Sequence, residues 1–339
     1  MSVIGILTAG GDCPGLNAVI RSVVTRISAA GAHEVVGIKN GWQGLMEDDI
    51  RPLGREDVRG IAGAGGTILG TSRMDPYVHG DGFASIRKTL AHNGIDRVIV
   101  VGGDGTLRTA LRLADEGLKT IGVPKTIDND IPATDVSFGF DTAVQIATDA
   151  IDRLKTTAES HNRVILCEVM GRTHGWIAVY AGLAAGADAI LIPEHQMPLE
   201  EVAQVIRSRH RRGRRYSIVV VAEGVRPPHA TTLPTDAFGF ERLGGVAYQI
   251  APELEALTGF ETRVTVLGHI QRGGTPTATD RVLAARLGAA AADLALADKD
   301  RLMVAVRSTR IEAVPLEDGA AETRGVDAEL FEVARTFFG

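Results

Sequence analysis

Cysteine is scarce in this chain, whose 339 residues include only Cys13 and Cys167. Two cysteines so far apart exclude a disulfide framework and a cysteine-based metal site, and they fit a reducing compartment. Aromatic residues make up only 4% of the chain, whereas glycine is abundant, with 40 residues. This composition is typical of an α/β enzyme with many tight turns between strands and helices.

The chain also lacks an excess of positive charge. Its net charge is −6, so no overall basic field attracts nucleic acid. There is no apolar run long enough to span a bilayer and no signal peptide, so we expect a cytoplasmic protein without a membrane partner. The densest basic run, at 207–215, is interpreted as a solvated helix end, with a site for a phosphorylated ligand as the alternative.

Several catalytic signatures are missing as well. The chain has no GxSxG elbow of a hydrolase and no paired-histidine zinc signature. Its first glycine-rich loop is neither a P-loop, because a GKS or GKT ending is absent, nor a dinucleotide-binding GxGxxG. These absences leave phosphate binding by some other glycine turn open.

What is present is a regular alternation of short apolar strands and amphipathic helices. Because this alternation is typical of parallel sheets, we expect doubly wound, mainly parallel α/β domains with ligands at the carboxyl ends of the strands. A polar insertion at 227–240 is expected to be a surface loop. The predicted strands are 2–8, 35–38, 97–101, 120–123, 163–169, 189–192, 217–221, 263–267 and finally 302–306.

Two glycine turns stand between a strand and a helix. One runs from Ala9 to Asn17, and the other is Gly102-Gly103-Asp104-Gly105-Thr106. A strand, a glycine turn and a helix together direct backbone N–H groups and a helix dipole toward a phosphate. Asp104 suits Mg²⁺ beside such phosphates, with a helix-capping role as the alternative. A third glycine-rich segment, 63–73, ends in Arg73 and is equally well explained as a ligand loop or an irregular connection.

The segment 123–135, VPKTIDNDIPATD, carries three carboxylates, on Asp128, Asp130 and Asp135. Proline at both 124 and 132 argues against a regular helix, so we expect a stiff loop. Clustered acids on such a loop indicate metal binding, proton transfer or both. Taken alone, the motif favours an acidic turn that caps the next helix, because short motifs are weak evidence of function.

These loops predict phosphoryl transfer when they are taken together. The two glycine turns supply amides for anions, and the acidic segment supplies carboxylates. Five arginines stand at loop or strand ends: Arg73, Arg163, Arg172, Arg263 and Arg272. An arginine-rich cleft with carboxylates and room for Mg²⁺ meets the needs of phosphoryl transfer, which requires charge neutralisation, positioning and removal of a proton.

The chain resembles the 6-phosphofructokinase family over nearly its whole length. The resemblance rests on eight segments that occur in the family's order: TAGGDCPGLNAVIR (8–21), GGTILGTSR (65–73), GGDGT (102–106), PKTIDNDIPATD (124–135), ESHNRV (159–164), EVMGRTHGW (168–176), VAEG (221–224) and GHIQRGGTPTATDR (268–281). It implies two α/β domains with the active site in the cleft between them. Residues 1–139 with 270–320 are expected to bind the phosphoryl donor, and 140–269 with 321–339 the sugar phosphate.

The resemblance implies a role for individual residues on the donor side. Asp128 is the general base for the 1-hydroxyl of fructose 6-phosphate, supported by Thr126 and Asp130. Asp104 holds Mg²⁺, and Arg73 and Arg172 stabilise the charge on the transferring phosphoryl group. The donor phosphates are bound around Gly11, Gly103, Gly105, Thr106 and Lys125.

On the sugar side, the resemblance implies binding of fructose 6-phosphate by Met170, Gly171, Arg172, Glu223, His269 and Arg272. Residues matching Arg163 and Arg263 reach the sugar phosphate from a neighbouring subunit in this family. The chain is therefore expected to form a homotetramer with shared active sites. The effector site of bacterial members is matched only in part, by Arg21, Arg55, Arg212 and Arg214 but not by Thr25 and Tyr216, so allosteric control stays open.

Two positions bear on the phosphoryl donor, and they disagree. In the family that the chain resembles, a glycine such as Gly105 is typical of ATP users, whereas a lysine such as Lys125 is typical of pyrophosphate users. An Asp at 105 would occupy the place of the ATP α-phosphate and repel it, but a lysine at 125 contacts phosphate in either donor. The sequence therefore predicts ATP, with pyrophosphate as the alternative.

The sequence disfavours two of three alternative functions. A non-enzymatic nucleotide sensor would need neither Asp128 nor the sugar-binding set, so their joint presence argues against it. A lipid or NAD kinase shares GGDGT but should lack the GHIQRGG and MGR segments, which this chain has. A kinase of a related sugar phosphate, such as sedoheptulose 7-phosphate, is harder to separate, because the sequence does not reveal pocket shape.

Overall fold

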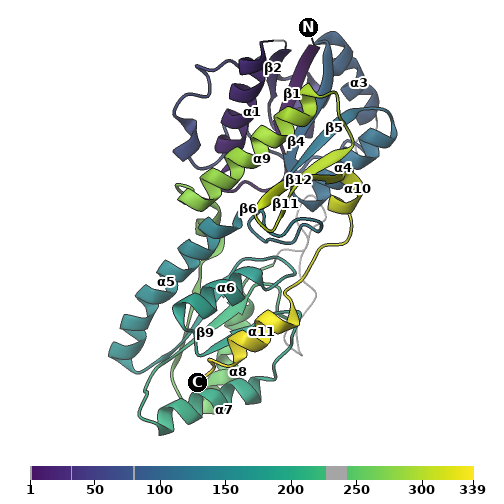
Figure 1. Ribbon diagram of the computed structural model, residues 1–339. Helices are drawn as coiled ribbons and strands as arrows, with labels where there is room; N and C mark the ends of the chain where they lie inside the picture. Colours follow the sequence, from purple (N-terminus) through teal and green to yellow (C-terminus); the bar gives the residue numbers. More distant parts are fainter. Residues whose placement is uncertain (1, 32, 79–80, 227–242) are drawn as a thin grey trace. The chain divides into compact units, whose positions relative to one another are not determined.

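The structure is a computed structural model that describes residues 2–31, 33–78, 81–226 and 243–339 (Figure 1). The chain folds into two compact units. The first unit contains Met1–Asp141 and Arg272–Thr323, and the second contains Thr142–Gln271 and Arg324–Gly339. The insertion expected at 227–240 lies outside the described residues.

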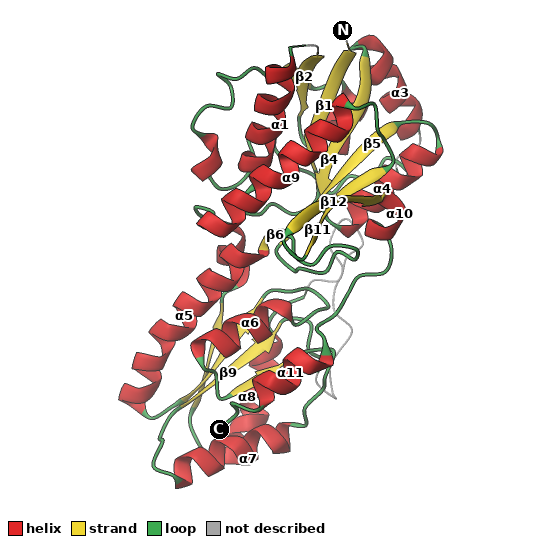
Figure 2. Cartoon of the chain, viewed as in Figure 1, coloured by secondary structure: helices red, strands yellow, loops and turns green. Residues whose placement is uncertain are grey.

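The first unit is built on a sheet with the strand order β12-β11-β5-β4-β1-β2-β3, and β6 pairs with β5 (Figure 2). The pairs β2–β3 and β11–β12 are antiparallel, and the remaining pairs are parallel. Its strands are β1 (Ser2–Thr8), β2 (His33–Ile38), β3 (Ile50–Pro52), β4 (Ile95–Gly102), β5 (Lys119–Thr126), β6 (Phe138–Gly139), β11 (Leu302–Arg307) and β12 (Arg310–Pro315).

Helices cover both faces of this sheet. The helices α1 (Leu16–Ala30) and α9 (Ala278–Leu296) lie side by side (Figure 1). The opposite face packs against α2 (Trp42–Glu47), α3 (Gly82–His92), α4 (Asp104–Asp115) and α10 (Leu316–Gly319). Fully buried side chains such as Leu7, Ile86 and Leu107 fill this core, and each contributes roughly 1.5–3 kcal/mol through burial.

The second unit has an all-parallel sheet with the order β10-β7-β9-β8. Its strands are β7 (Val164–Val169), β8 (Ala189–Leu191), β9 (Ser217–Ala222) and β10 (Thr262–Val266). The helices α7 (Leu199–Arg211) and α8 (Val246–Thr258) pack on one face. The other face contacts α6 (Trp176–Ala185) and α11 (Ala328–Arg335). The long α5 (Phe140–His161) begins in the first unit and continues in the second. Two short 3₁₀ helices, η1 (Ile61–Gly63) and η2 (Gly268–Arg272), are also present.

The predicted class of mainly parallel, doubly wound α/β sheets is confirmed. Two details of the prediction were wrong. The strand at 302–306 is not the last, because β12 follows it and pairs antiparallel at the sheet edge. The strand before the acidic segment also does not end at residue 123: β5 runs through Pro124 to Thr126.

Proline is tolerated inside β5 for a specific reason. On one side Pro124 pairs with Gly102 of β4, while β11 on the other side pairs only with Ile121 and Gly122. Where a strand has no hydrogen-bonding neighbour on one side, a residue facing that side does not need its N–H group. Proline, which lacks an N–H group, therefore costs little stability at such a position. Within the described ranges, no helix is both long and apolar enough to cross a membrane.

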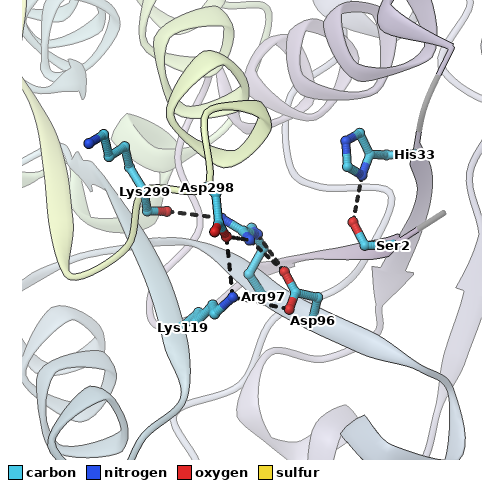
Figure 3. Close-up of polar contacts among 7 residues, drawn as sticks. All are labelled: Ser2, His33, Asp96, Arg97, Lys119, Asp298 and Lys299. Atoms are coloured by element: carbon cyan, nitrogen blue, oxygen red, sulfur yellow. Dashed lines mark hydrogen bonds and ion pairs between the residues drawn. The ribbon is translucent and has the colours of Figure 1, made fainter.

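A buried arginine ties the amino ends of two strands to the end of α9 (Figure 3). Arg97 donates to Asp96 at 2.5 Å and to the carbonyl of Lys299 at 3.2 Å, and it also pairs with Asp298. Lys119 bridges the same two carboxylates at 3.3 and 3.2 Å. Because this cluster lies at the amino ends of β4 and β5, it supports the sheet from the end opposite the glycine turns.

Candidate active site

Three loops of the first unit converge at the carboxyl ends of β1, β4 and β5, which are neighbours in the sheet. A Cβ placed on Gly10 would lie 3.3 Å from Thr106 Oγ1 and 3.5 Å from Lys125 Nζ. One placed on Gly103 would lie 3.4 Å from the carbonyl oxygen of Lys125. Both glycine turns and the start of the acidic segment therefore meet, as expected for parallel strands.

The first glycine turn also holds the segment that carries Arg73. Gly10 has φ 84°, in the left-handed region that favours glycine. Its N–H donates to the carbonyl of Ser72 at 2.9 Å, and its carbonyl accepts from the Thr71 hydroxyl at 2.7 Å. Arg73, which is exposed, is therefore attached directly to the turn through its two preceding residues.

The second glycine turn begins α4. Gly103 is the N-cap and Asp104 the first helical residue, so Asp104 lies where the helix dipole favours a negative group. Its carboxylate contacts Arg108 at 3.2 Å, one turn along the helix. Gly105 is exposed, and a Cβ added there would meet no atom within 4 Å, so the space beside this glycine is open.

The acidic segment is ordered by its own polar groups. Asn129 has φ 52°, and its side-chain oxygen accepts from the N–H of Ser137 at 3.1 Å. The carboxylate of Asp135 accepts from the N–H of Ser308 at 2.5 Å. Asn129 and Asp135 thus stabilise the loop, and the third acid, Asp130, is buried with an exposed fraction of 4%.

Asp128 differs from these neighbours. Its backbone N–H donates to Thr126 Oγ1 at 3.0 Å, and its side chain is buried, with an exposed fraction of 4%. The carboxylate oxygen Oδ1 is also buried, and no group in the described part of the chain donates a hydrogen bond to it. A buried carboxylate oxygen without a partner is costly, so it is an acceptor that awaits a donor from outside the protein.

Two cations lie beside the first glycine turn. Lys125 is buried, its ammonium donates to the carbonyl of Gly11, and burial lowers its pKa. Arg272 donates from Nη1 to the carbonyl of Asp12 at 3.1 Å. The family resemblance implies that Arg272 binds the sugar phosphate, and in this structure its guanidinium lies against the turn expected to bind the donor.

The donor atoms fit Mg²⁺ bound together with a phosphate rather than an ion held by protein alone. In the described ranges no group of three or more His, Cys, Asp or Glu side chains is arranged to hold a metal. Mg²⁺ is commonly bound by one or two carboxylates, with substrate phosphates and water completing its shell. Asp104, at the start of α4, offers such a carboxylate.

A second group of predicted residues lies at the carboxyl end of the second unit's sheet. The buried Met170 follows β7 directly, and Gly171 and Arg172 form a turn with φ 145° and 53°. Glu223, after β9, accepts from the N–H groups of Gly171 at 3.3 Å and Arg172 at 3.0 Å. His269 follows β10 and is exposed. The structure therefore brings these five residues to the ends of three adjacent strands.

Arg163 and Arg263 lie at the other end of the same sheet. Arg163 precedes β7, and Arg263 is the second residue of β10, so both mark the amino ends of their strands. Six residues of β7 separate this end from Met170, which corresponds to about 20 Å. Within this unit, the two arginines and the turn at Arg172 cannot contact one small ligand.

Sequence reasoning missed three acids that organise these positions. Glu261 pairs with Arg163 at 2.7 Å and also with Arg263. Glu168, buried in β7, accepts from the N–H groups of Gly245 and Ala247 and so fixes the start of α8. Glu194 accepts from the N–H groups of Gly175 and Val326, each at 3.0 Å. Their partners are distant in sequence, so no local spacing signals these contacts.

Comparison with known proteins shows which family the chain belongs to. The family model described as phosphofructokinase matches residues 3–295. The chain is 53% identical to pyrophosphate–fructose 6-phosphate 1-phosphotransferase of Amycolatopsis methanolica, over 99% of both chains. It is 50% identical to ATP-dependent 6-phosphofructokinase 3 of Streptomyces coelicolor, over 95% of this chain and 96% of the other.

A solved structure shares the fold. The phosphofructokinase of Pichia pastoris matches with a TM-score of 0.83 and 34% identity, over 99% of this chain. This chain spans only 38% of that longer protein. With a family match over most of its length and relatives at about half identity, the chain belongs to the phosphofructokinase family.

Proposed function

We propose that this protein is a 6-phosphofructokinase, which transfers the γ-phosphoryl group of ATP to the 1-hydroxyl of fructose 6-phosphate. The observation that carries the proposal is the buried Oδ1 of Asp128, which has no donor among the described residues. An acceptor of this kind beside two glycine turns suits an alcohol that must lose its proton while it attacks a phosphorus atom.

In this proposal Asp128 accepts the proton of the sugar hydroxyl as general base. Thr126 Oγ1, which accepts from the Asp128 N–H at 3.0 Å, fixes the backbone beneath that carboxylate. Arg73 and Arg172 stabilise the charge that develops on the transferred group, as guanidinium groups do for phosphates. Asp104, with Asp130 as a second carboxylate, would hold Mg²⁺, which when bound neutralises the donor phosphates.

The sugar phosphate is assigned to the turn and strand ends of the second unit. Glu223 suits the sugar hydroxyls, and Met170 and His269 lie at the ends of adjacent strands. We assign Arg163 and Arg263 to the active site of a neighbouring subunit. Their position at the amino ends of β7 and β10 supports this assignment, because one chain cannot bring them to its own Arg172. A homotetramer with shared sites, acting in the cytoplasm, completes the proposal.

ATP is proposed as the donor because the space beside Gly105 is open. An aspartate at this position would place a negative charge there and repel the α-phosphate. Pyrophosphate is the second candidate, and the relative at 53% identity favours it, because its name is that of a pyrophosphate-dependent enzyme. A relative at 50% identity carries the name of an ATP-dependent enzyme. Lys125 is compatible with both donors, because its ammonium lies beside the glycine turn.

A matrix of donors and acceptors tests the proposal. The purified protein is assayed with Mg²⁺, with ATP or pyrophosphate as donor, and with fructose 6-phosphate or sedoheptulose 7-phosphate as acceptor. We expect the highest kcat/KM for ATP with fructose 6-phosphate. A higher kcat/KM for pyrophosphate than for ATP would contradict ATP as the donor. A higher kcat/KM for sedoheptulose 7-phosphate would contradict fructose 6-phosphate as the acceptor. No turnover with any pair would contradict the proposed function.

A further inference from the structure

The turn that carries Arg172 is held at both of its ends by a glutamate. At its start, Glu223 accepts from the N–H groups of Gly171 and Arg172. At its end, Glu194, three residues after β8, accepts from the N–H of Gly175 with both carboxylate oxygens, at 3.0 and 3.1 Å. The two acids follow β9 and β8, which are neighbours in the sheet. The turn is therefore fixed from two adjacent strand ends.

Between these two contacts the backbone of the turn is tightly constrained. The N–H of His174 donates to the carbonyl of Gly171 at 3.0 Å and closes the turn around Arg172. Gly171 and Arg172 have φ 145° and 53°, and the left-handed region is costly for an arginine. A Cβ on Gly175 would lie 2.3 Å from the side chain of Ile192, so the end of the turn packs closely against the chain after β8. A disfavoured backbone conformation persists only while the surrounding contacts hold it.

Glu194 is charged and lies at the start of a helix. Gly175 is the N-cap of α6 and has no side chain to cap it, so the Glu194 carboxylate takes this role and meets the positive end of the helix dipole. Burial raises the pKa of Glu194, but the contact with His174 and the backbone hydrogen bonds outweigh burial and leave the pKa below its usual value. Hydrogen bonds to such an ionised acceptor are stronger than those between neutral groups.

The same carboxylate holds the segment in which the chain returns to the second unit, at Arg324. Its oxygen Oε1 accepts from the N–H of Val326 at 3.0 Å. The carbonyl of Arg324 accepts from Trp176 Nε1, in the first turn of α6, at 3.1 Å. Residues 324–326 are therefore bound both to the start of α6 and to Glu194, and through Glu194 they are joined to the turn.

We propose that Glu194 is a positioning residue for Arg172: by joining the end of the turn to the segment 324–326, it keeps Arg172 where it stabilises the transferred phosphoryl group. The proposal rests on the proposed function, in which Arg172 stabilises that charge. Glu194 is not itself a substrate ligand, because its carboxylate is occupied by the N–H groups of Gly175 and Val326. Its effect reaches the reaction through the backbone of Arg172.

A double-mutant cycle with Arg172 tests the proposal. Glu194→Ala removes the acceptor, and we expect kcat to fall roughly tenfold, while the KM for the donor changes little. Glu194→Gln keeps one acceptor oxygen and should recover most of this loss. In the Arg172→Ala background, Glu194→Ala should lower kcat no further, because the effect of a residue that acts through another disappears when the other is removed.

Ile206→Val is the control for a general loss of stability. Ile206 is fully buried in the core of the second unit, on α7, so the loss of one methyl group lowers the denaturation midpoint without touching the turn. Its kcat should equal that of the wild type. The proposal is wrong if Glu194→Ala keeps the wild-type kcat, or if it lowers kcat by the same factor with Arg172 present and with Arg172→Ala.

Hydrogen exchange separates this proposal from the proposed function, because it needs no substrate. Mass spectrometry of peptides that contain residues 171–175 should show faster exchange in Glu194→Ala than in the wild type, and little change in Ile206→Val. Unchanged exchange in Glu194→Ala would contradict the hold of Glu194 on the turn, even in an active enzyme. A wild-type protein without turnover would contradict the proposed function, and with it the role of Arg172, whatever the exchange shows.

Discussion

Glu223 accepts a hydrogen bond from the backbone N–H of Arg172 at 3.0 Å and so shapes the turn that carries this arginine. Arg172 has φ 53°, a left-handed conformation that costs a non-glycine residue about 1–2 kcal/mol. Gly224 fits closely beneath the turn, because a Cβ there would lie 2.1 Å from the carbonyl oxygen of Arg172. The end of β9 thus holds Arg172 in a conformation that its own backbone disfavours.

Replacing Glu223 therefore affects catalysis as well as sugar binding. We expect Glu223→Ala to raise the KM for fructose 6-phosphate and to lower kcat roughly tenfold, because the Arg172 turn loses its acceptor. Glu223→Gln keeps an acceptor oxygen and should retain more of kcat. Steady-state kinetics on both variants provide the measurement. Equal kcat values for the two would show that Glu223 does not act through the turn.

Gly105→Asp is expected to weaken the use of ATP selectively. The added side chain enters open space, so the fold tolerates it, but its charge repels the α-phosphate of a nucleotide. Pyrophosphate has no α-phosphate linked to a nucleoside and should be affected less. The ratio of kcat/KM for the two donors is the measurement, with Gly105→Ala as the uncharged control. A parallel fall for both donors would contradict the steric argument.

Shared active sites predict that two defective variants complement each other. Arg163→Ala removes an arginine that, in the proposal, binds the sugar phosphate in the active site of a neighbouring subunit. Arg172→Ala removes an arginine from the active site of the chain's own subunit. Refolding the two variants together should create sites with both arginines intact and activity above the sum of the separate variants. A mixture no more active than that sum would contradict active sites that are shared between subunits.

The cluster around Arg97 is expected to stabilise the first unit without affecting catalysis. Arg97→Met removes hydrogen bonds to Asp96, Asp298 and Lys299, and we expect a loss of roughly 1–3 kcal/mol in the free energy of unfolding. Urea denaturation measures this loss at neutral pH. Arg26→Met, which breaks an exposed pair with Asp293, is the control and should leave the denaturation midpoint unchanged.

The difference between wild type and Arg97→Met should depend on pH. Burial raises the pKa of Asp96, but hydrogen bonds from Arg97 and Lys119 outweigh it and leave the pKa below its usual value. A lowered pKa in the folded state stabilises the protein above the unfolded pKa of about 3.9, and this stabilisation is lost as the pH falls further. A difference that is unchanged from pH 7 to pH 3 would rule out the carboxylate as its source.

The sequence predicted the elements near the glycine turns closely because periodicity and turn chemistry are local. The strand expected at 2–8, directly before the first glycine turn, is found as Ser2–Thr8. Strand β12 was missed, since it lies at a sheet edge and none of its residues is buried. The division of roles in the acidic segment was also hidden, because the pairing of Asp135 with Ser308 requires the tertiary fold. The same is true of Glu261, which pairs with two arginines at the amino ends of adjacent strands.

The central claim is that the Asp128 carboxylate, whose buried Oδ1 has no donor in the described part of the chain, removes the proton of the sugar hydroxyl. The kcat of Asp128→Ala tests this claim most directly. Losing a positioned base lowers kcat by roughly two to four orders of magnitude, and we expect a loss of this size with the KM for the donor nearly unchanged. Asp135→Asn, whose wild-type carboxylate bonds to Ser308 instead, should keep near-normal kcat. Turnover of Asp128→Ala within a few-fold of the wild type would contradict the assignment of Asp128 as the base.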